Sequence, residues 1–186
     1  MGVIFIIGGA RSGKSSFALQ LAKGIGGKVA FIATAQAGDE EMLKRIQIHK
    51  QDRPEEWTTI EEPFDIASAI DSAKGHNIVI VDCITLLISN LLCSTENLDD
   101  ISWIFNKIEN LINSAKEFVG TAIIISNEVG MGIVPENRLA REFRDMAGMA
   151  NQMIANSADK VYFCFSGIPV LIKDSGGFNG QVNVNA

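Results

Sequence analysis

Residues 8–15 read Gly8-Gly9-Ala10-Arg11-Ser12-Gly13-Lys14-Ser15 and come directly after the apolar run Val3-Ile4-Phe5-Ile6-Ile7. The octapeptide fits the phosphate-binding pattern G-x-x-x-x-G-K-[ST], whose glycines let backbone N–H groups surround an anion at a helix N-terminus. Lys14 can reach the outer phosphates, and the Ser15 hydroxyl is placed to ligand Mg²⁺. The alternative is a chance glycine-rich turn, but the β-favouring run before it and the apolar helix face within residues 17–22 argue against that. The stretch therefore predicts a protein that binds nucleoside triphosphates.

More apolar runs of β type follow at residues 29–32, 78–81, 122–125 and 161–165. Helix-length stretches separate most of them, which is typical of a parallel sheet covered by helices on both faces. The near-continuous apolarity of the runs agrees, because a strand buried on both faces has no polar side. A short final strand at 169–172 follows the turn Ser166-Gly167-Ile168, and so tight a link predicts antiparallel pairing. We expect an α/β fold with a mostly parallel sheet and an antiparallel C-terminal strand.

The chain has 186 residues, of which 47% are hydrophobic, and this is enough for one substantial core. We expect a single catalytic domain over residues 1–173 and a polar, loosely ordered tail over 174–186, which is rich in Gly and Asn. The net charge of −6 argues against a general nucleic-acid binder, because such proteins concentrate Lys and Arg. The expected partner is a small anion or another protein.

The cellular setting is inferred from cysteines and apolar runs. Cys83, Cys93 and Cys164 are widely spaced and odd in number, so we expect reduced, mostly buried thiols and neither a disulfide framework nor a zinc site. No run approaches the roughly 18 consecutive apolar residues of a membrane span, and the N-terminal run has no basic region before it. These features predict a soluble cytoplasmic protein.

Polar residues that follow apolar strands carry the most functional information, because ligands of open α/β sheets collect at the carboxyl ends of the strands. The segment Ala33-Thr34-Ala35 is small enough to lie against a nucleotide. Asp82 ends a buried run, in the position where phosphate-loop proteins hold their metal, often through water. Its alternative role is to cap a helix that begins near Thr85. We favour the metal role for Asp82, together with Ser15.

A third strand end leads into the loop at residues 126–135, which holds two glycines and Glu128. A catalytic or substrate-binding role for Glu128 and a purely structural one are both open. The helix that follows carries Arg138, Arg141 and Arg144 at a spacing of three. We interpret these arginines as a solvated face rather than as phosphate ligands.

His49 lies in a stretch, residues 39–51, that reads as a helix with acidic residues at its start and basic ones later, before Pro54 stops it. Met42, Leu43, Ile46 and His49 fall on one face. A single histidine on an apolar helix face is usually a satisfied core residue. The alternative is a nucleophile, since neutral imidazole can attack phosphorus while Mg²⁺ and Lys14 neutralise phosphate charge.

Several motifs together resemble one family closely. They are residues 8–15, Ile32-Ala33-Thr34-Ala35, Arg45-Ile46-Gln47-Ile48-His49-Lys50-Gln51-Asp52-Arg53-Pro54 with Trp57, Asp82-Cys83-Ile84-Thr85, Ser89-Asn90-Leu91-Leu92 and the string from Ser126 to Arg138. Over residues 1–173 the chain is similar to the bifunctional adenosylcobinamide kinase / adenosylcobinamide-phosphate guanylyltransferase family of cobalamin biosynthesis. A phosphate loop alone indicates a superfamily, whereas the string Asn127 to Pro135 and the His-x-x-x-Arg-Pro segment are far more specific.

The resemblance implies two activities, a RecA-like phosphate-loop fold and a homotrimer. ATP or GTP would phosphorylate the hydroxyl of adenosylcobinamide, and GTP would then donate GMP to the new phosphate through a guanylylated histidine, here His49. Lys14 and Glu128 are the other catalytic residues that we expect. The nucleotide contacts that the resemblance implies are Gly8, Gly9, Ala10, Arg11, Ser12, Gly13, Lys14, Ser15, Ala33, Thr34, Ala35, His49, Lys50, Gln51, Asp52, Glu61 and Asp82.

Two points remain open at this level. The family often has a second histidine directly before the nucleophile, where this chain has Ile48. The two reactions also need different geometries, because a kinase acts at the γ-phosphate and guanylyl transfer at the α-phosphate. We therefore expect two nucleotide poses or a movement of the helix at 39–54 toward the phosphate loop. A kinase for another small hydroxyl compound is the main competing function; a switch GTPase or a non-catalytic nucleotide-binding module is less favoured.

Overall fold

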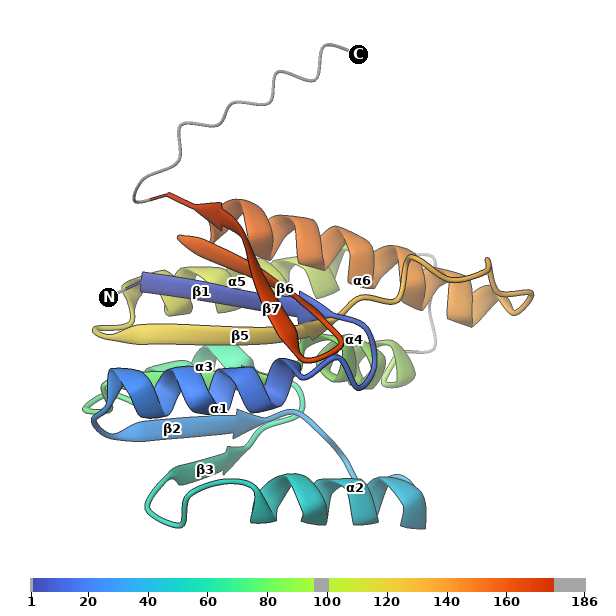
Figure 1. The fold of residues 1–186 in the computed structure, drawn as a ribbon. Helices are drawn as coiled ribbons and strands as arrows, with labels where there is room; N and C mark the ends of the chain where they lie inside the picture. The colour runs from blue at the N-terminus through green and yellow to red at the C-terminus, as the bar shows by residue number, and fades with distance from the viewer. Residues whose placement is uncertain (1, 96–100, 176–186) are drawn as a thin grey trace.

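In the part of the chain that the structure describes, seven strands form one sheet in the order β3-β2-β4-β5-β1-β6-β7 (Figure 1). The computed structural model describes residues 2–95 and 101–175. The strands are β1 (Gly2–Gly8), β2 (Val29–Ala33), β3 (Thr58–Glu61), β4 (Ile78–Asp82), β5 (Thr121–Asn127), β6 (Lys160–Phe165) and β7 (Ile168–Asp174). Neighbouring strands pair in parallel except β6 and β7, which are antiparallel. The mostly parallel sheet and its antiparallel C-terminal strand, both predicted from the sequence, are confirmed.

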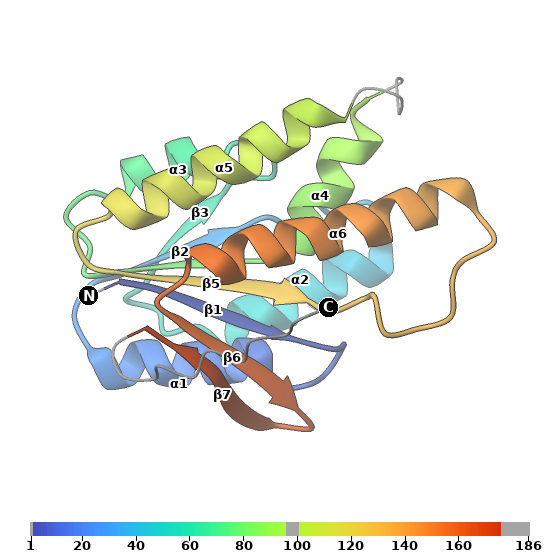
Figure 2. The same ribbon diagram turned by 90° about the horizontal axis from the view of Figure 1, so that it is seen from above.

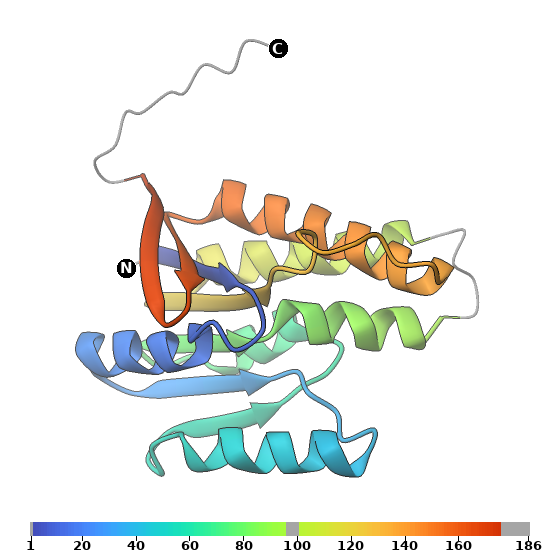
Figure 3. The ribbon, with the colours of Figure 1, turned by 45° about the vertical axis from the view of Figure 1, so that its right-hand side comes forward.

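Helices cover both faces of the sheet. They are α1 (Lys14–Ile25), α2 (Glu40–Gln51), α3 (Ile66–Ser72), α4 (Ile84–Cys93), α5 (Ser102–Glu117) and α6 (Arg138–Ser157). Figure 2 shows α3, α4, α5 and α6 on one face and α1 on the other. Helix α2 lies apart from them, beside the edge strand β3 (Figure 3).

The two faces of the sheet bury two separate apolar clusters, and alternate residues of each central strand contribute to each. In β1, Phe5 and Ile7 pack on the side of α3 to α6, whereas Ile6 packs on the side of α1. In β4, Val79 and Ile80 divide in the same way. A strand that is buried on both faces needs apolar side chains throughout, which explains the continuous apolar runs of the sequence.

The structure differs from the sequence-based expectations at the two edges of the sheet. Strand β3 was not predicted, because three of its four residues are exposed and no apolar run marks it. At the other edge, β7 extends to Asp174, the first residue of the expected tail, and Asp174 pairs in register with Lys160. Residues 176–186 of that tail lie outside the described residues. Among the described residues, no helix combines the length and apolarity that a bilayer crossing requires.

The three cysteines are free, as expected, but only Cys164 is fully buried; Cys83 is half-buried and Cys93 exposed. The expectation of mostly buried thiols was therefore too strong. Burial raises the pKa of Cys83 to about 11, so this thiol stays protonated at neutral pH.

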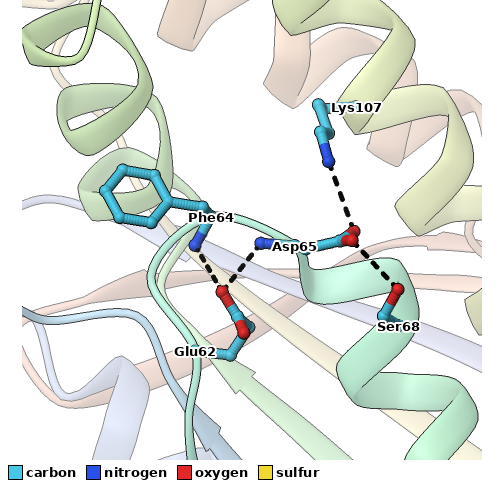
Figure 4. Close-up of polar contacts among 5 residues, drawn as sticks. All are labelled: Glu62, Phe64, Asp65, Ser68 and Lys107. Carbon is cyan, nitrogen blue, oxygen red and sulfur yellow. Dashed lines mark hydrogen bonds and ion pairs between the residues drawn. The ribbon is translucent and has the colours of Figure 1, made fainter.

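The connection from β3 to α3 is held by a small polar cluster (Figure 4). The Glu62 carboxylate accepts hydrogen bonds from the backbone N–H groups of Phe64 and Asp65, both at 2.9 Å. Asp65 in turn accepts from the Ser68 hydroxyl at 2.9 Å and lies 3.4 Å from the Lys107 ammonium of α5. These contacts join the segment after β3 to helices α3 and α5.

Candidate active site

The phosphate loop joins β1 to α1 with a geometry that requires glycine at two positions. Gly13 has φ +92°, in the left-handed region, and a Cβ there would lie 3.0 Å from the Gly167 Cα. A Cβ on Gly8 would lie 2.5 Å from the Cys164 carbonyl oxygen. The Gly167 N–H donates to the Ser12 carbonyl at 2.9 Å, so the β6–β7 turn supports the loop from outside.

Lys14, the first residue of α1, points its ammonium back into the loop. It donates to the Gly9 carbonyl at 2.6 Å, to the Asn127 Oδ1 at 3.0 Å and to the Ser12 hydroxyl at 3.5 Å. Burial lowers the pKa of Lys14, and the nearby Cys83 and Asp82 oppose that shift. A partly desolvated cation held in this way can interact strongly with phosphate oxygens.

Asp82 ends β4 beside the first turn of α1. Its carboxylate accepts a hydrogen bond from the Ser15 hydroxyl at 3.0 Å. Helix α4 begins after Cys83 and has no side-chain cap, so the alternative role of Asp82 as a helix cap is wrong. Burial raises the pKa of Asp82, while the Ser15 hydrogen bond and the charges of His49, Arg53 and Lys14 oppose that rise.

These groups line a cavity of about 1000 Å³ at the carboxyl edge of the sheet. Of the residues predicted from the sequence, the cavity is lined by Ala10, Arg11, Ser12, Gly13, Lys14, Ser15, Ala33, Ala35, His49, Lys50, Glu61 and Asp82. The others, Gly8, Gly9, Thr34, Gln51, Asp52 and Glu128, are not among its lining residues. The structure thus brings together residues from five separate parts of the chain.

Thr34 is fully buried and has a structural contact instead. Its hydroxyl donates to the Cys83 carbonyl at 2.8 Å and accepts from the Cys83 N–H at 2.7 Å. The Asn90 side chain donates to the Thr34 carbonyl at 2.8 Å. Thr34 therefore links the ends of β2 and β4, and its neighbours Ala33 and Ala35 line the cavity.

Helix α2 forms another wall of the cavity. None of its twelve residues is buried, in contrast to the strands that precede the phosphate loop and Asp82. Asp39 caps it by accepting from the Met42 N–H at 2.7 Å, and Glu40 and Glu41 follow in the first turn, as the charge pattern predicted. The helix face with Met42, Ile46 and His49 lines the cavity. His49 is exposed, so the interpretation as a satisfied core histidine is wrong.

Arg53 is a cavity residue that the sequence analysis quoted in a motif but did not select. Its guanidinium lies over the Phe31 ring, 3.7 Å from the centroid, and its Nε and Nη1 atoms are buried and have no hydrogen-bond partner among the described residues. Burial lowers the pKa of Arg53, and Asp82 and Glu61 oppose that shift. An arginine directly after a helix that carries a candidate nucleophile was the signal that could have identified it.

Glu128 is held within its own loop. Its carboxylate accepts from the Gly130 N–H at 2.5 Å, and its own N–H donates to the Gly8 carbonyl at 2.9 Å. Arg144 donates to the Gly130 carbonyl, and Arg141 donates to the carbonyls of residues 135 and 136 at 3.0 and 2.6 Å. The arginines of α6 were interpreted as a solvated face, but two of them fix this loop.

The arrangement suits chemistry on a nucleoside triphosphate. One wall offers a phosphate loop, an ammonium and a pair of hard oxygen ligands, and the other offers an exposed imidazole next to Lys50 and Arg53. Backbone N–H groups and cations neutralise phosphate charge, and an imidazole can form a covalent bond to phosphorus. A cavity with both can support transfer from either end of the triphosphate chain.

Comparisons with known proteins agree with this chemistry. The family model described as "Cobinamide kinase / cobinamide phosphate guanyltransferase" matches residues 4–172. The chain is 43% identical to the bifunctional adenosylcobalamin biosynthesis protein CobP of Pseudomonas aeruginosa, over 90% of this chain and 95% of that protein. It is 41% identical to the bifunctional adenosylcobalamin biosynthesis protein CobU of Escherichia coli, over 92% of this chain and 99% of that one.

Among solved structures, the chain resembles a prototypical ATPase from the type III secretion system of pathogenic bacteria. The TM-score is 0.55 at 12% sequence identity, and the match covers 87% of this chain and 50% of that one. At this identity the likeness concerns the fold alone. It confirms the expected RecA-like phosphate-loop architecture.

Proposed function

The chain belongs to the cobinamide kinase / cobinamide phosphate guanyltransferase family, and from that premise we propose how one cavity serves the two reactions. It is a bifunctional enzyme of adenosylcobalamin biosynthesis, which phosphorylates cobinamide and then transfers a guanylyl group to cobinamide phosphate. We further propose that the acceptor is adenosylcobinamide, that ATP or GTP donates the phosphoryl group and that GTP donates the guanylyl group.

We assign the guanylyl-carrying group to His49. The observation that carries this assignment is an exposed imidazole, on a helix with no buried residue, that lines the same cavity as Lys14 and Asp82. An imidazole nitrogen attacks the α-phosphorus of GTP, the bond to the bridging oxygen breaks, and pyrophosphate leaves with the electron pair. A phosphate oxygen of the acceptor then attacks the same phosphorus, and the P–N electron pair returns to His49.

Phosphoryl transfer uses the other wall of the cavity. The phosphate loop and Lys14 grip the triphosphate, and the acceptor hydroxyl approaches the γ-phosphorus. Since one pose cannot present both phosphorus atoms, either the nucleotide binds in two poses or α2 moves toward the loop. The exposure of α2 supports the second option, because little apolar burial opposes its displacement.

Ser15 and Asp82 would hold Mg²⁺. They fit the ion, since a hydroxyl and a carboxylate 3.0 Å apart are hard oxygen donors, and Mg²⁺ is commonly bound by one or two protein oxygens plus phosphates and waters. The ion would neutralise charge on the phosphate oxygens. Glu128 is proposed to act by shaping its loop, since its contacts are with Gly130 and Gly8.

We also propose a homotrimer and a cytoplasmic location. The β7 side chains Ile168, Val170, Leu171 and Ile172 are between 42% and 66% exposed, and an apolar edge strand of this kind favours contact with a second copy of the chain. Light scattering on the purified protein tests the trimer. The three free thiols support a reducing compartment.

Labelled GTP tests the nucleophile. With the label on the α-phosphorus, the protein should gain an acid-labile covalent adduct, and His49→Ala should form none. With the label on the γ-phosphorus, no protein label should appear, but cobinamide should become labelled in both the wild type and His49→Ala. Full guanylyl transfer by His49→Ala would overturn the assignment and leave the family membership intact.

A further inference from the structure

Asn127 ends β5, the strand that separates the phosphate-loop strand β1 from the Asp82 strand β4. It is in register with Gly8, and the next residue along donates its N–H to the Gly8 carbonyl at 2.9 Å. The Asn127 carbonyl accepts from the Asn151 side chain of α6 at 3.3 Å. Its backbone is therefore fixed between the phosphate loop and the helical layer.

The side chain of Asn127 has a defined orientation. Its partner is the Lys14 ammonium at 3.0 Å, and because an ammonium can only donate, the amide atom that meets it is the oxygen. The Nδ2 atom of the amide is then the free donor, and it has no acceptor within residues 2–95 and 101–175. Asn127 also lines the cavity. A rigidly placed N–H₂ donor thus stands beside the ammonium that reaches the outer phosphates.

We propose that Asn127 is a specificity-determining residue that favours phosphoryl transfer over guanylyl transfer by donating to the terminal phosphoryl group. The inference rests on the proposed function. In the kinase step, the acceptor oxygen bonds to the γ-phosphorus, the bond to the β–γ bridging oxygen breaks with its electron pair going to the nucleoside diphosphate, and the hydroxyl proton passes to solvent. In the transition state, negative charge spreads over the γ-phosphoryl oxygens, and the Asn127 amide stabilises it by donating a hydrogen bond.

Guanylyl transfer places its reaction centre two phosphates away. In that reaction the Asn127 donor contacts the β- and γ-phosphates, which leave as pyrophosphate. It binds them about equally in the ground state and in the transition state, so it has little effect on the rate. A donor that acts at one end of the triphosphate chain should change one rate constant and leave the other almost unchanged. Neither Lys14 nor the phosphate loop has this selectivity, because both hold the nucleotide in either reaction.

The test measures both half-reactions on the full-length protein, with γ-labelled GTP transferred to cobinamide and α-labelled GTP transferred to the protein. Asn127→Ala should lower kcat of the kinase by about 10²-fold and the single-turnover guanylylation rate by less than about tenfold. Asn127→Asp keeps an oxygen for Lys14 but has no N–H donor, so its kinase kcat should fall at least as far. Asn137→Ala removes an amide at the N-cap of α6, outside the cavity lining, and should leave the ratio of the two rates unchanged.

Equal losses in both half-reactions, or a kinase rate that Asn127→Asp retains, would overturn the proposal; the latter would mean that Asn127 only holds Lys14. Nucleotide binding and circular dichroism show that the variants are folded, and Asn127→Asp, which has nearly the same shape, remains informative if the alanine variant does not fold. His49→Ala in the same assays separates the two ideas. If it loses guanylylation and keeps the kinase, the proposed function stands whatever Asn127 does.

Discussion

The two walls of the cavity are built in opposite ways. The phosphate-loop wall continues from strands whose side chains are mostly buried, and its Lys14 has three protein acceptors. Helix α2 has no buried residue, and its wall meets the sheet through the exposed ion pair between Lys50 and Glu61 and through the Arg53 guanidinium over the Phe31 ring. One wall is therefore set before the nucleotide arrives, and the other can adjust to it.

This difference matches the two kinds of chemistry. Gripping a triphosphate requires preorganised donors, whose positions do not change during the reaction. Delivering an imidazole to the α-phosphorus, and then presenting the guanylylated imidazole to a second substrate, requires a group that can occupy more than one position. A rigid wall for binding and an adjustable wall for the covalent step meet both requirements in one cavity.

The largest expected effect is on the rigid wall. Lys14→Ala should lower both reactions by about 10³-fold, because it removes a partly desolvated cation from the phosphates. Lys50→Ala, on the adjustable wall, should lower guanylylation alone and by about tenfold. Steady-state and single-turnover assays with labelled GTP measure both. If Lys14→Ala spared the kinase, the assignment of the phosphate-gripping wall would be wrong.

Paired truncations of isoleucine compare the walls in stability. Ile80 in β4 is fully buried, and Ile80→Ala should lower the free energy of unfolding by about 2–5 kcal/mol through lost burial and the cavity that remains. Ile46→Ala in α2 should cost less than about 1 kcal/mol, since Ile46 is only half-buried. Urea denaturation followed by circular dichroism measures both values. Similar losses at the two positions would show that α2 is packed as firmly as the sheet.

Much of this contrast could be predicted from the sequence, and the reasons are physical. The central strands are continuous apolar runs because both faces are covered, and the phosphate loop has a fixed pattern because its backbone must curl round an anion. The helix from Glu40 to Gln51 was also predicted, with Asp39 and the acidic first turn as its start. The sequence did not predict whether the apolar face of this helix enters the core or lines a cavity, because both kinds of face have the same spacing of apolar residues.

The residues that the sequence analysis missed depend on contacts between distant segments. Arg53 is identified by its position over Phe31, and Asn127 by its hydrogen bond to Lys14, which is 113 residues away. Edge strand β3 has too few apolar residues to give a β pattern, since it pairs on one side only. The spacing of apolar residues in a sequence indicates which residues are buried. Arg53, Asn127 and β3 are instead identified by the residues that they contact, which that spacing does not show.

A smaller effect is expected from the cap of α2. Asp39→Ala removes the acceptor of the Met42 N–H and should destabilise the helix by about 1 kcal/mol. Because α2 buries no residue, this loss should appear as faster hydrogen exchange of the α2 amides, with the exchange of β4 and β5 unchanged. Asn137→Ala makes the matched change at the cap of α6, which packs on the core, and should lower global stability instead. Uniform exchange changes after Asp39→Ala would contradict the independence of the α2 wall.

The smallest expected effect is the pH dependence of the link between the walls. The hydrogen bond and charge of Lys50 lower the pKa of Glu61, so the pair stabilises the folded state above the ordinary pKa of a glutamate and is lost as the pH falls through the lowered value. Both side chains are largely exposed, so the contribution is at most about 0.5 kcal/mol. Glu61→Gln should therefore be slightly less stable than the wild type at pH 7, and the difference should vanish once the pH is well below the lowered pKa of Glu61. Asp65→Asn gives the matched measurement on the main body, where Ser68 and Lys107 lower the pKa of Asp65. If the Glu61 difference persisted in acid, the ion pair would not be its cause, and α2 would be joined to the sheet by contacts other than charge.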